Sequence, residues 1–338
     1  MNMTTTGTSQ TVRFTPPDRA MMDAARQLIH TQIASLKLEF LPVMKEKLLP
    51  LKTALNAADS QFVSHLAAIT AQLSSTDLAP IDLKQQLIEA DQRLNSEQKN
   101  QALALLNAQR TRQVSALTAV LRSAAQAVAE SADDLQQIEV DPGNTNTQDI
   151  LQRQLEGINL RSSGQEAHIN TVAEDRRLLD NAIATFEQHN LAEVFNEALP
   201  TAQELSTLAM PSPHLIALEA GLGRLQKLLG KISGALKYSD LVEQRDQLRN
   251  RQNSLLAEAQ SAQKEAKATA ARLEELATLT SLNNNKMIWV QHATQLSDSL
   301  YRFLESDITR VEEPAVINLH LEQLNAYMKS LYTIKRTR

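Results

Sequence analysis

The sequence predicts an all-α protein: an elongated multi-helix bundle with long coiled-coil helices and a helical hairpin at one end. Alanine, leucine, glutamine, glutamate and serine dominate the 338 residues, whereas aromatic residues make up 3% and glycine only 8 positions. A large sheet is not expected from that composition. Apolar residues recur at helical intervals over long segments, which favours one elongated body over two separate globules.

The helices of the first half are each predicted to start at a proline or a capping side chain, because such residues suit a first helical turn. These starts lie at Pro16-Pro17-Asp18, Pro42, Pro80 and Asn95-Ser96. The predicted helices are 16–41, 42–73, 80–95 and 96–140.

The second half begins with a tight reversal predicted at 141–144, where proline and glycine stand between Asp and Asn. A helix is then expected to about His189, and Pro200 breaks the apolar piece that follows. From His214 one helix is predicted to run to about Leu282 and to end at three asparagines, 283–285. Leucines spaced at seven from Leu241 indicate coiled-coil packing within it. Two further helices are expected over 287–310 and 314–332.

These elements predict four parts. Residues 1–15 are expected to be disordered, and 16–145 with 283–338 to form a helical-bundle tail. A long coiled-coil stalk is expected over 146–189 and 241–282, and a hairpin head over 190–240.

Residues 205–236 differ from their neighbours in charge and in glycine content. They carry four charged residues, whereas 240–276 carry thirteen, and they hold four of the eight glycines. Apolar residues here repeat at spacings of three and four, while Arg224, Lys227, Lys231 and Lys237 lie off that face. An apolar face beside a cationic one is typical of a helix that enters a lipid interface. The residues predicted to insert are Leu215, Ile216, Leu218, Leu222, Leu225, Leu228, Leu229, Ile232 and Leu236.

A leucine stripe at this spacing also packs ordinary protein cores, and both readings hold if the stripe is buried first and released later. Four glycines within fourteen residues weaken a helix, by up to ~1 kcal/mol each. We therefore expect them to ease refolding or to let helices approach closely in a membrane. The predicted hinge or flexibility residues of the head are Pro211, Pro213, Gly221, Gly223, Gly230 and Gly234.

Several other function classes are disfavoured. A net charge of −5 gives no positive field for nucleic acid, and the absence of cysteine excludes disulfides and thiolate metal sites. The histidines are scattered, and Gly221-Leu222-Gly223 lacks the rest of a dinucleotide fingerprint. We therefore expect no enzyme, metal or cofactor. With neither a Sec-type signal nor an apolar run of eighteen residues, the protein is expected to be soluble and, if secreted, to leave the cell by another route.

Two stretches carry a family resemblance: 211–240, PSPHLIALEAGLGRLQKLLGKISGALKYSD, and 286–300, KMIWVQHATQLSDSL. With their flanking helices they resemble the B component of the two-component alpha-pore-forming cytotoxins of the alpha-xenorhabdolysin type (XaxAB and YaxAB). The resemblance implies a ClyA-like bundle, secreted by a bacterium as a soluble monomer. It also implies a separate A component as partner and a hetero-oligomeric ring in a target-cell lipid membrane.

The resemblance implies that the head opens and its apolar residues face lipid, whereas Lys227 and Lys231 face water or neighbouring subunits. A variant carrying Leu225→Asp and Leu229→Asp is then expected to fold but not to permeabilise membranes. The alternative is a non-catalytic helical scaffold or coiled-coil interaction protein in which 205–236 is a static helix-docking site.

Overall fold

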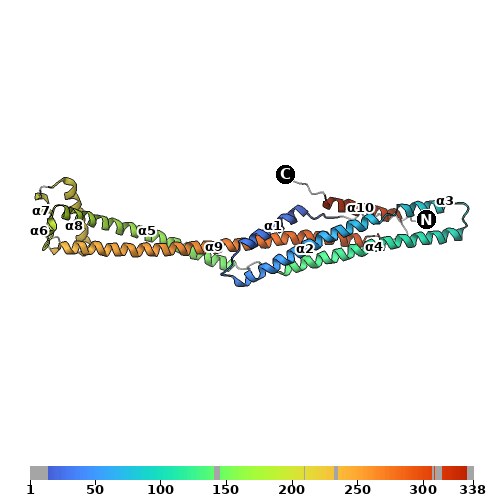
Figure 1. Cartoon of the computed structure of the whole chain (residues 1–338), viewed down its shortest axis with the longest axis horizontal. Coiled ribbons are helices and arrows are strands. Elements are labelled where there is room, and N and C mark those ends of the chain that lie inside the picture. Colours follow the sequence, from blue (N-terminus) through green and yellow to red (C-terminus); the bar gives the residue numbers. More distant parts are fainter. Residues whose placement is uncertain are drawn as a thin grey trace, which may run out of the picture. The chain divides into compact units, whose positions relative to one another are not determined.

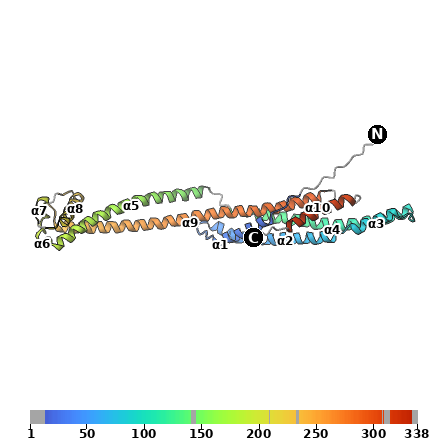
Figure 2. The same ribbon diagram turned by 90° about the horizontal axis from the view of Figure 1, so that it is seen from above.

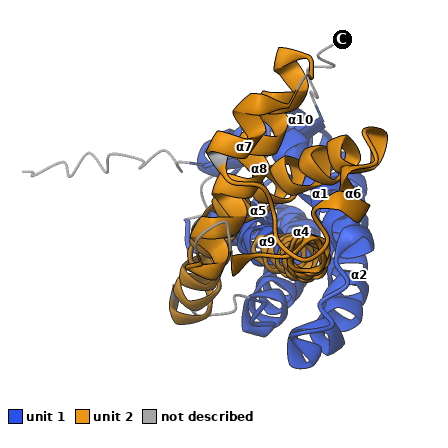
Figure 3. Cartoon of the chain, turned by 90° about the vertical axis from the view of Figure 1, so that its left-hand side faces the viewer, with its two compact units in different colours: residues 1–144, 274–338 blue, residues 145–273 orange. Residues whose placement is uncertain are grey.

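A computed structural model describes residues 14–140, 145–208, 210–231, 235–306, 308 and 314–332 of the chain. Within these ranges the regular elements are helices and no strand is present, so the all-α prediction is confirmed (Figure 1). The chain divides into two compact units, residues 1–144 with 274–338 and residues 145–273 (Figure 3). In order, the helices are α1 (Arg19–Ser35), α2 (Pro42–Ser75), α3 (Ala79–Ala90), α4 (Ser96–Gln137), α5 (Thr145–Gln188), α6 (Leu191–Val194), α7 (Ala202–Thr207), α8 (Ser212–Leu229), α9 (Tyr238–Leu304) and α10 (Pro314–Tyr332).

The first unit packs α2 against α1, α4 and α10. Its helix starts follow the predicted signals: Pro42 opens α2, and Asn95 caps α4 by accepting a hydrogen bond from the Gln98 N–H while Gln98 bonds back. Trp289 of α9 is fully buried, and its ring meets Phe62 edge-on with ring centroids 6.3 Å apart. The single tryptophan of the chain is therefore a core anchor of this unit.

The second unit pairs α5 with the first part of α9, which runs alongside it (Figure 2). Side-chain hydrogen bonds join Gln154 to Glu265 at 3.2 Å, Gln165 to Glu258 at 3.3 Å and Arg176 to Gln252 at 2.9 Å. The partner's number falls as the α5 number rises, so the two helices are antiparallel. Of the leucines spaced at seven on α9, Leu241 and Leu255 are buried and Leu248 is partly buried.

The single helix predicted from His214 to Leu282 is wrong, because two helices occupy that range. Gly230 follows α8 with a left-handed backbone (φ 64°), and its N–H bonds back to the Gln226 carbonyl, which ends the helix. Eight residues after Gly230, α9 begins at Tyr238.

That predicted helix was also expected to end at asparagines 283–285. This end is wrong, since α9 continues to Leu304. Tertiary contacts hold this part of α9. The Asn285 amide donates to the Gln32 side chain at 3.2 Å, and the buried Lys286 ammonium donates to the Ile138 carbonyl at 2.7 Å. Such bonds outweigh the weak helix propensity of asparagine. The predicted turn at 141–144 lies outside the described residues.

Candidate functional site

The head, residues 190–240, holds α6, α7 and α8, and α8 is its main helix. Two prolines shape the start of α8. Pro211 has an extended backbone (φ −57°, ψ 139°) just before the helix, and Pro213 occupies the first turn, where a missing N–H costs nothing. In this structure both predicted hinge prolines mark the boundary between the loop and α8.

The predicted apolar stripe of α8 is largely buried against α5. Leu218 and Leu225 have no exposed surface, and Leu222 is 3% exposed. They share one core with residues of α5, of α7, of the loops and of the start of α9. Its other buried members are Leu179, Ala182, Ile183, Phe186, Leu199, Leu205, Leu236 and Leu241.

The remaining stripe residues have different surroundings. Leu228 and Leu229 pack partly buried against the same core, and Leu215 is half-buried. Ile216 is 64% exposed, which makes it the exception on α8. Leu236 is buried in the segment before α9, where its carbonyl accepts the Leu199 N–H at 2.7 Å. Ile232 and Gly234 lie outside the described residues.

The three described glycines of the head have three different environments. A Cβ at Gly221 would lie 2.4 Å from the Ala182 Cβ and 2.9 Å from the Leu178 carbonyl, so α8 and α5 touch there. A Cβ at Gly223 would meet nothing within 4 Å. Gly230 supplies the left-handed residue that ends α8.

Polar contacts accompany the α5–α8 packing. Arg224 of α8 is paired with Asp175 of α5, whose side chain is only 10% exposed. Lys227 and Lys231 are exposed, as predicted for the polar side of this segment. Lys237 lies 3.7 Å from Glu197 in an exposed pair.

A histidine pair in the head was not predicted from the sequence. Nε2 of His189, just after α5, lies 2.8 Å from Nδ1 of His214 in the first turn of α8. The two positions are 25 residues apart, so no short motif reveals them. They meet because α8 folds back antiparallel on α5.

Two other titratable side chains of this region, Tyr238 and Glu204, form hydrogen bonds that do not involve the histidines. The Tyr238 hydroxyl donates to Glu187 at 3.2 Å, and partial burial is the main cause that raises the pKa of Tyr238, with the Glu187 charge adding to it. Thr201 and Glu204 form a capping box on α7. The bond from the Thr201 backbone N–H, followed by the bond from its hydroxyl, lowers the pKa of Glu204.

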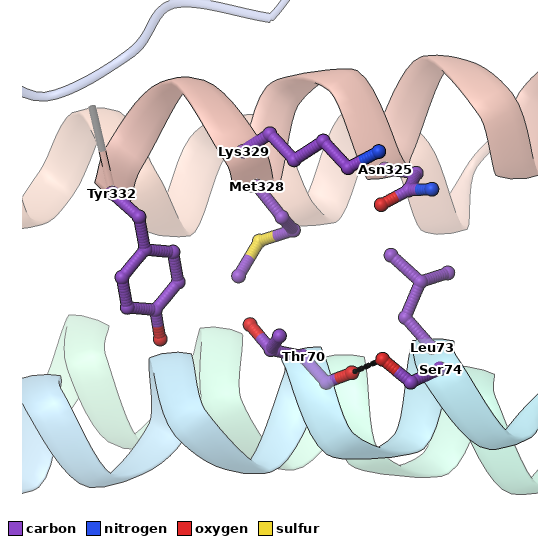
Figure 4. A pocket seen from close by; sticks show the side chains of 7 residues that line it. All are labelled: Thr70, Leu73, Ser74, Asn325, Met328, Lys329 and Tyr332. Atoms are coloured by element: carbon purple, nitrogen blue, oxygen red, sulfur yellow. Dashed lines mark hydrogen bonds between the residues drawn. The ribbon is translucent and has the colours of Figure 1, made fainter.

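Across the described residues no group of three or more potential metal ligands occurs, and no described helix combines the length and apolarity needed to cross a membrane. The first unit has a groove of about 470 Å³ between α2 and α10, into which Met328 and Tyr332 project (Figure 4). Its lining residues are Thr70, Leu73, Ser74, Asn325, Met328, Lys329 and Tyr332, a set without paired carboxylates or histidine.

The fold of this chain is similar to folds of known proteins. No protein-family model and no curated protein matches the sequence. Among solved structures, PaxB from Photorhabdus luminescens superposes with a TM-score of 0.84 at 17% identity, over 95% of this chain and 97% of PaxB. XaxB from Xenorhabdus nematophila gives 0.75 at 16% identity, over 94% and 98%. A chain of the XaxAB pore complex from the same organism gives 0.71 at 17% identity, with the same coverage. The chain therefore has the XaxB/YaxB-type fold.

Proposed function

We propose that this chain is the B-type subunit of a two-component alpha-pore-forming toxin. In this proposal it pairs with a separate A component, its head opens, and α8 with its apolar neighbours enters a target-cell membrane within a hetero-oligomeric ring. No catalytic step is involved. The carrying observation is that one fold, over nearly the whole chain, matches both XaxB and a chain of the XaxAB pore complex.

The head supports the proposal through what it buries. Leu218, Leu222 and Leu225 lie in the core, so the closed head keeps the apolar face of α8 away from water. Apolar burial is worth roughly 25 cal/mol per Å², whether the surrounding atoms belong to α5 or to lipid. Moving α8 from its own core into a bilayer therefore exchanges one apolar environment for another, and the net cost is small.

Oligomerisation explains how such a helix makes a durable pore. One amphipathic helix binds a membrane reversibly, whereas many helices held in a ring insert together. Lys227 and Lys231 are exposed in the closed head and are proposed to face water or neighbouring subunits after insertion. Their charges would not have to cross the hydrocarbon unpaired.

The test is dye release from liposomes and lysis of red cells, first with this protein alone and then with the A component encoded beside it. Release that requires both proteins supports a two-component pore former. A helical scaffold predicts that liposomes stay intact in both mixtures. That result, obtained with an A component shown to be folded, would reject the proposal and return the α8 leucines to an ordinary core.

A further inference from the structure

The packing of α8 on α5 has three polar or close contacts along one antiparallel interface. Arg224 pairs with Asp175 toward one end, Gly221 touches Ala182 in the middle, and His214 meets His189 at the other end. The histidine contact is the one that joins the first turn of α8 to the end of α5. It is also the one made by two imidazoles, and histidine is the side-chain type whose charge most readily changes near neutral pH.

We propose that the His189–His214 hydrogen bond is a proton-sensitive latch, which holds the first turn of α8 on the end of α5 and releases it when both rings are protonated. The biological use of the latch rests on the proposed function, because opening of the head is the step that it would permit. The latch itself is a property of the folded chain in solution.

The chemistry follows from the two ring nitrogens that meet at 2.8 Å. With both rings neutral, one nitrogen carries a proton and donates it to the lone pair of the other. A first added proton strengthens the bond, because a cationic ring then donates to a neutral one. A second proton removes the last lone pair and places two N–H groups and two positive charges face to face.

The carboxylates on the elements around the pair either have other partners or are exposed. On α5, Glu187 is bonded to the Tyr238 hydroxyl of α9, and Asp175 is paired with Arg224 at the far end of the interface. Glu193 of α6 and Glu219 of α8 are exposed, and Glu204 of α7 is bound to Thr201. Among the described residues no hydrogen bond or ion pair joins either ring to a carboxylate.

The capping box of α7 is not the acid-sensitive element. Its bonds hold the pKa of Glu204 below the ordinary value of 4.5, so the cap is present above that range and is lost only as the pH falls below it. At pH 5.5 Glu204 is still charged, whereas imidazoles are already titrating.

The experiment measures the α8–α5 distance in the full chain without membranes. The protein has no cysteine, so Ser163→Cys on α5 and Ser212→Cys at the start of α8, both exposed, accept two spin labels at defined positions. The distance between the two labels is measured by pulsed electron–electron double resonance at pH 7.5 and pH 5.5. We expect the acidic sample to contain a longer distance, with its population raised about tenfold, as the loss of one hydrogen bond plus like-charge repulsion implies.

Three variants separate the latch from a general acid effect. His214→Asn, alone or together with His189→Gln, keeps an amide where the ring nitrogen lies but removes double protonation, so neither variant should respond to pH. His168→Asn removes an exposed histidine of α5 outside the pair and should respond like the parent. Circular dichroism at both pH values checks that the helices persist. An unchanged parent distance, or a response that survives His214→Asn, would overturn the latch.

The proposed function is tested apart from the latch, by lysis with the A component at both pH values. A normal distance response without lysis at either pH would reject the function and keep the latch. Lysis with a distance that ignores pH would keep the function and reject the latch.

Discussion

At the scale of single residues, Gly221 and Gly223 look alike in the sequence but differ in the fold. Gly221→Ala places a methyl group 2.4 Å from the Ala182 Cβ and 2.9 Å from a backbone oxygen. We expect a loss of about 1–3 kcal/mol in head stability, because the backbone must move. Hydrogen–deuterium exchange of α8 amides measures it.

Gly223→Ala is the matched control. Its new methyl group meets nothing within 4 Å, so the better helix propensity of alanine acts alone and stabilises by up to about 1 kcal/mol. Equal exchange rates in the two variants would show that the contact at Gly221 does not hold α8 on α5.

The variant expected from the sequence to fold, Leu225→Asp with Leu229→Asp, has to be reconsidered. Leu225 is fully buried in the head core, and a carboxylate there is neither solvated nor paired. We therefore expect that variant to unfold the head, in which case lost lysis would say nothing about membranes.

Ile216→Asp is the better test of insertion, since Ile216 is 64% exposed on the same helix. We expect unchanged folding and a strong loss of dye release, because under the proposed insertion a charge at this site would have to be desolvated. Leu160→Asp, at a 73% exposed site of α5 outside the head, should leave release intact. Equal release by both variants would contradict insertion through Ile216.

At the scale of elements, helix starts are predicted from the sequence more accurately than helix ends. Pro42 and Asn95 act locally, so the starts of α2 and α4 could be predicted from them. The end of α8 depends on a left-handed Gly230, and the continuation of α9 depends on contacts of Asn285 and Lys286 with distant parts of the first unit. Periodicity alone cannot reveal either feature. The end of α8 depends on the backbone conformation of one residue, and the continuation of α9 depends on tertiary contacts.

The same limit applies to the head. The stripe residues were identifiable from their spacing, and whether they enter membranes stays a prediction. Their burial against α5, the Gly221 contact and the histidine pair all depend on how α8 folds back. None of these has a short-range signature.

The end of α8 gives a prediction of its own. Gly230→Ala forces a side chain into the left-handed region, at a cost of about 1–2 kcal/mol. We expect the head to lose that stability, measured by chemical denaturation. Gly164→Ala on α5, where nothing lies within 4 Å, should instead stabilise slightly. If Gly164→Ala destabilised the protein and Gly230→Ala did not, the role assigned to Gly230 would be contradicted.

At the scale of the whole molecule, the two units carry different spectroscopic reporters. The single tryptophan, Trp289, is buried in the first unit, whereas helical circular dichroism reports both units. We expect Gly221→Ala to lower the midpoint of part of the circular dichroism transition and to leave the tryptophan fluorescence midpoint unchanged. A parallel fall in both midpoints would show that the units unfold as one.

The contact between Gly221 and Ala182 constrains evolution as well as folding. Two positions on neighbouring helices share a space that admits one methyl group and no second. In a set of aligned relatives, any enlargement at one of these sites should therefore be accompanied by a reduction at the other. The larger side chain could then lie on either helix, while the summed side-chain volume at the two positions stays constant. Such correlated substitutions would be evidence of this contact.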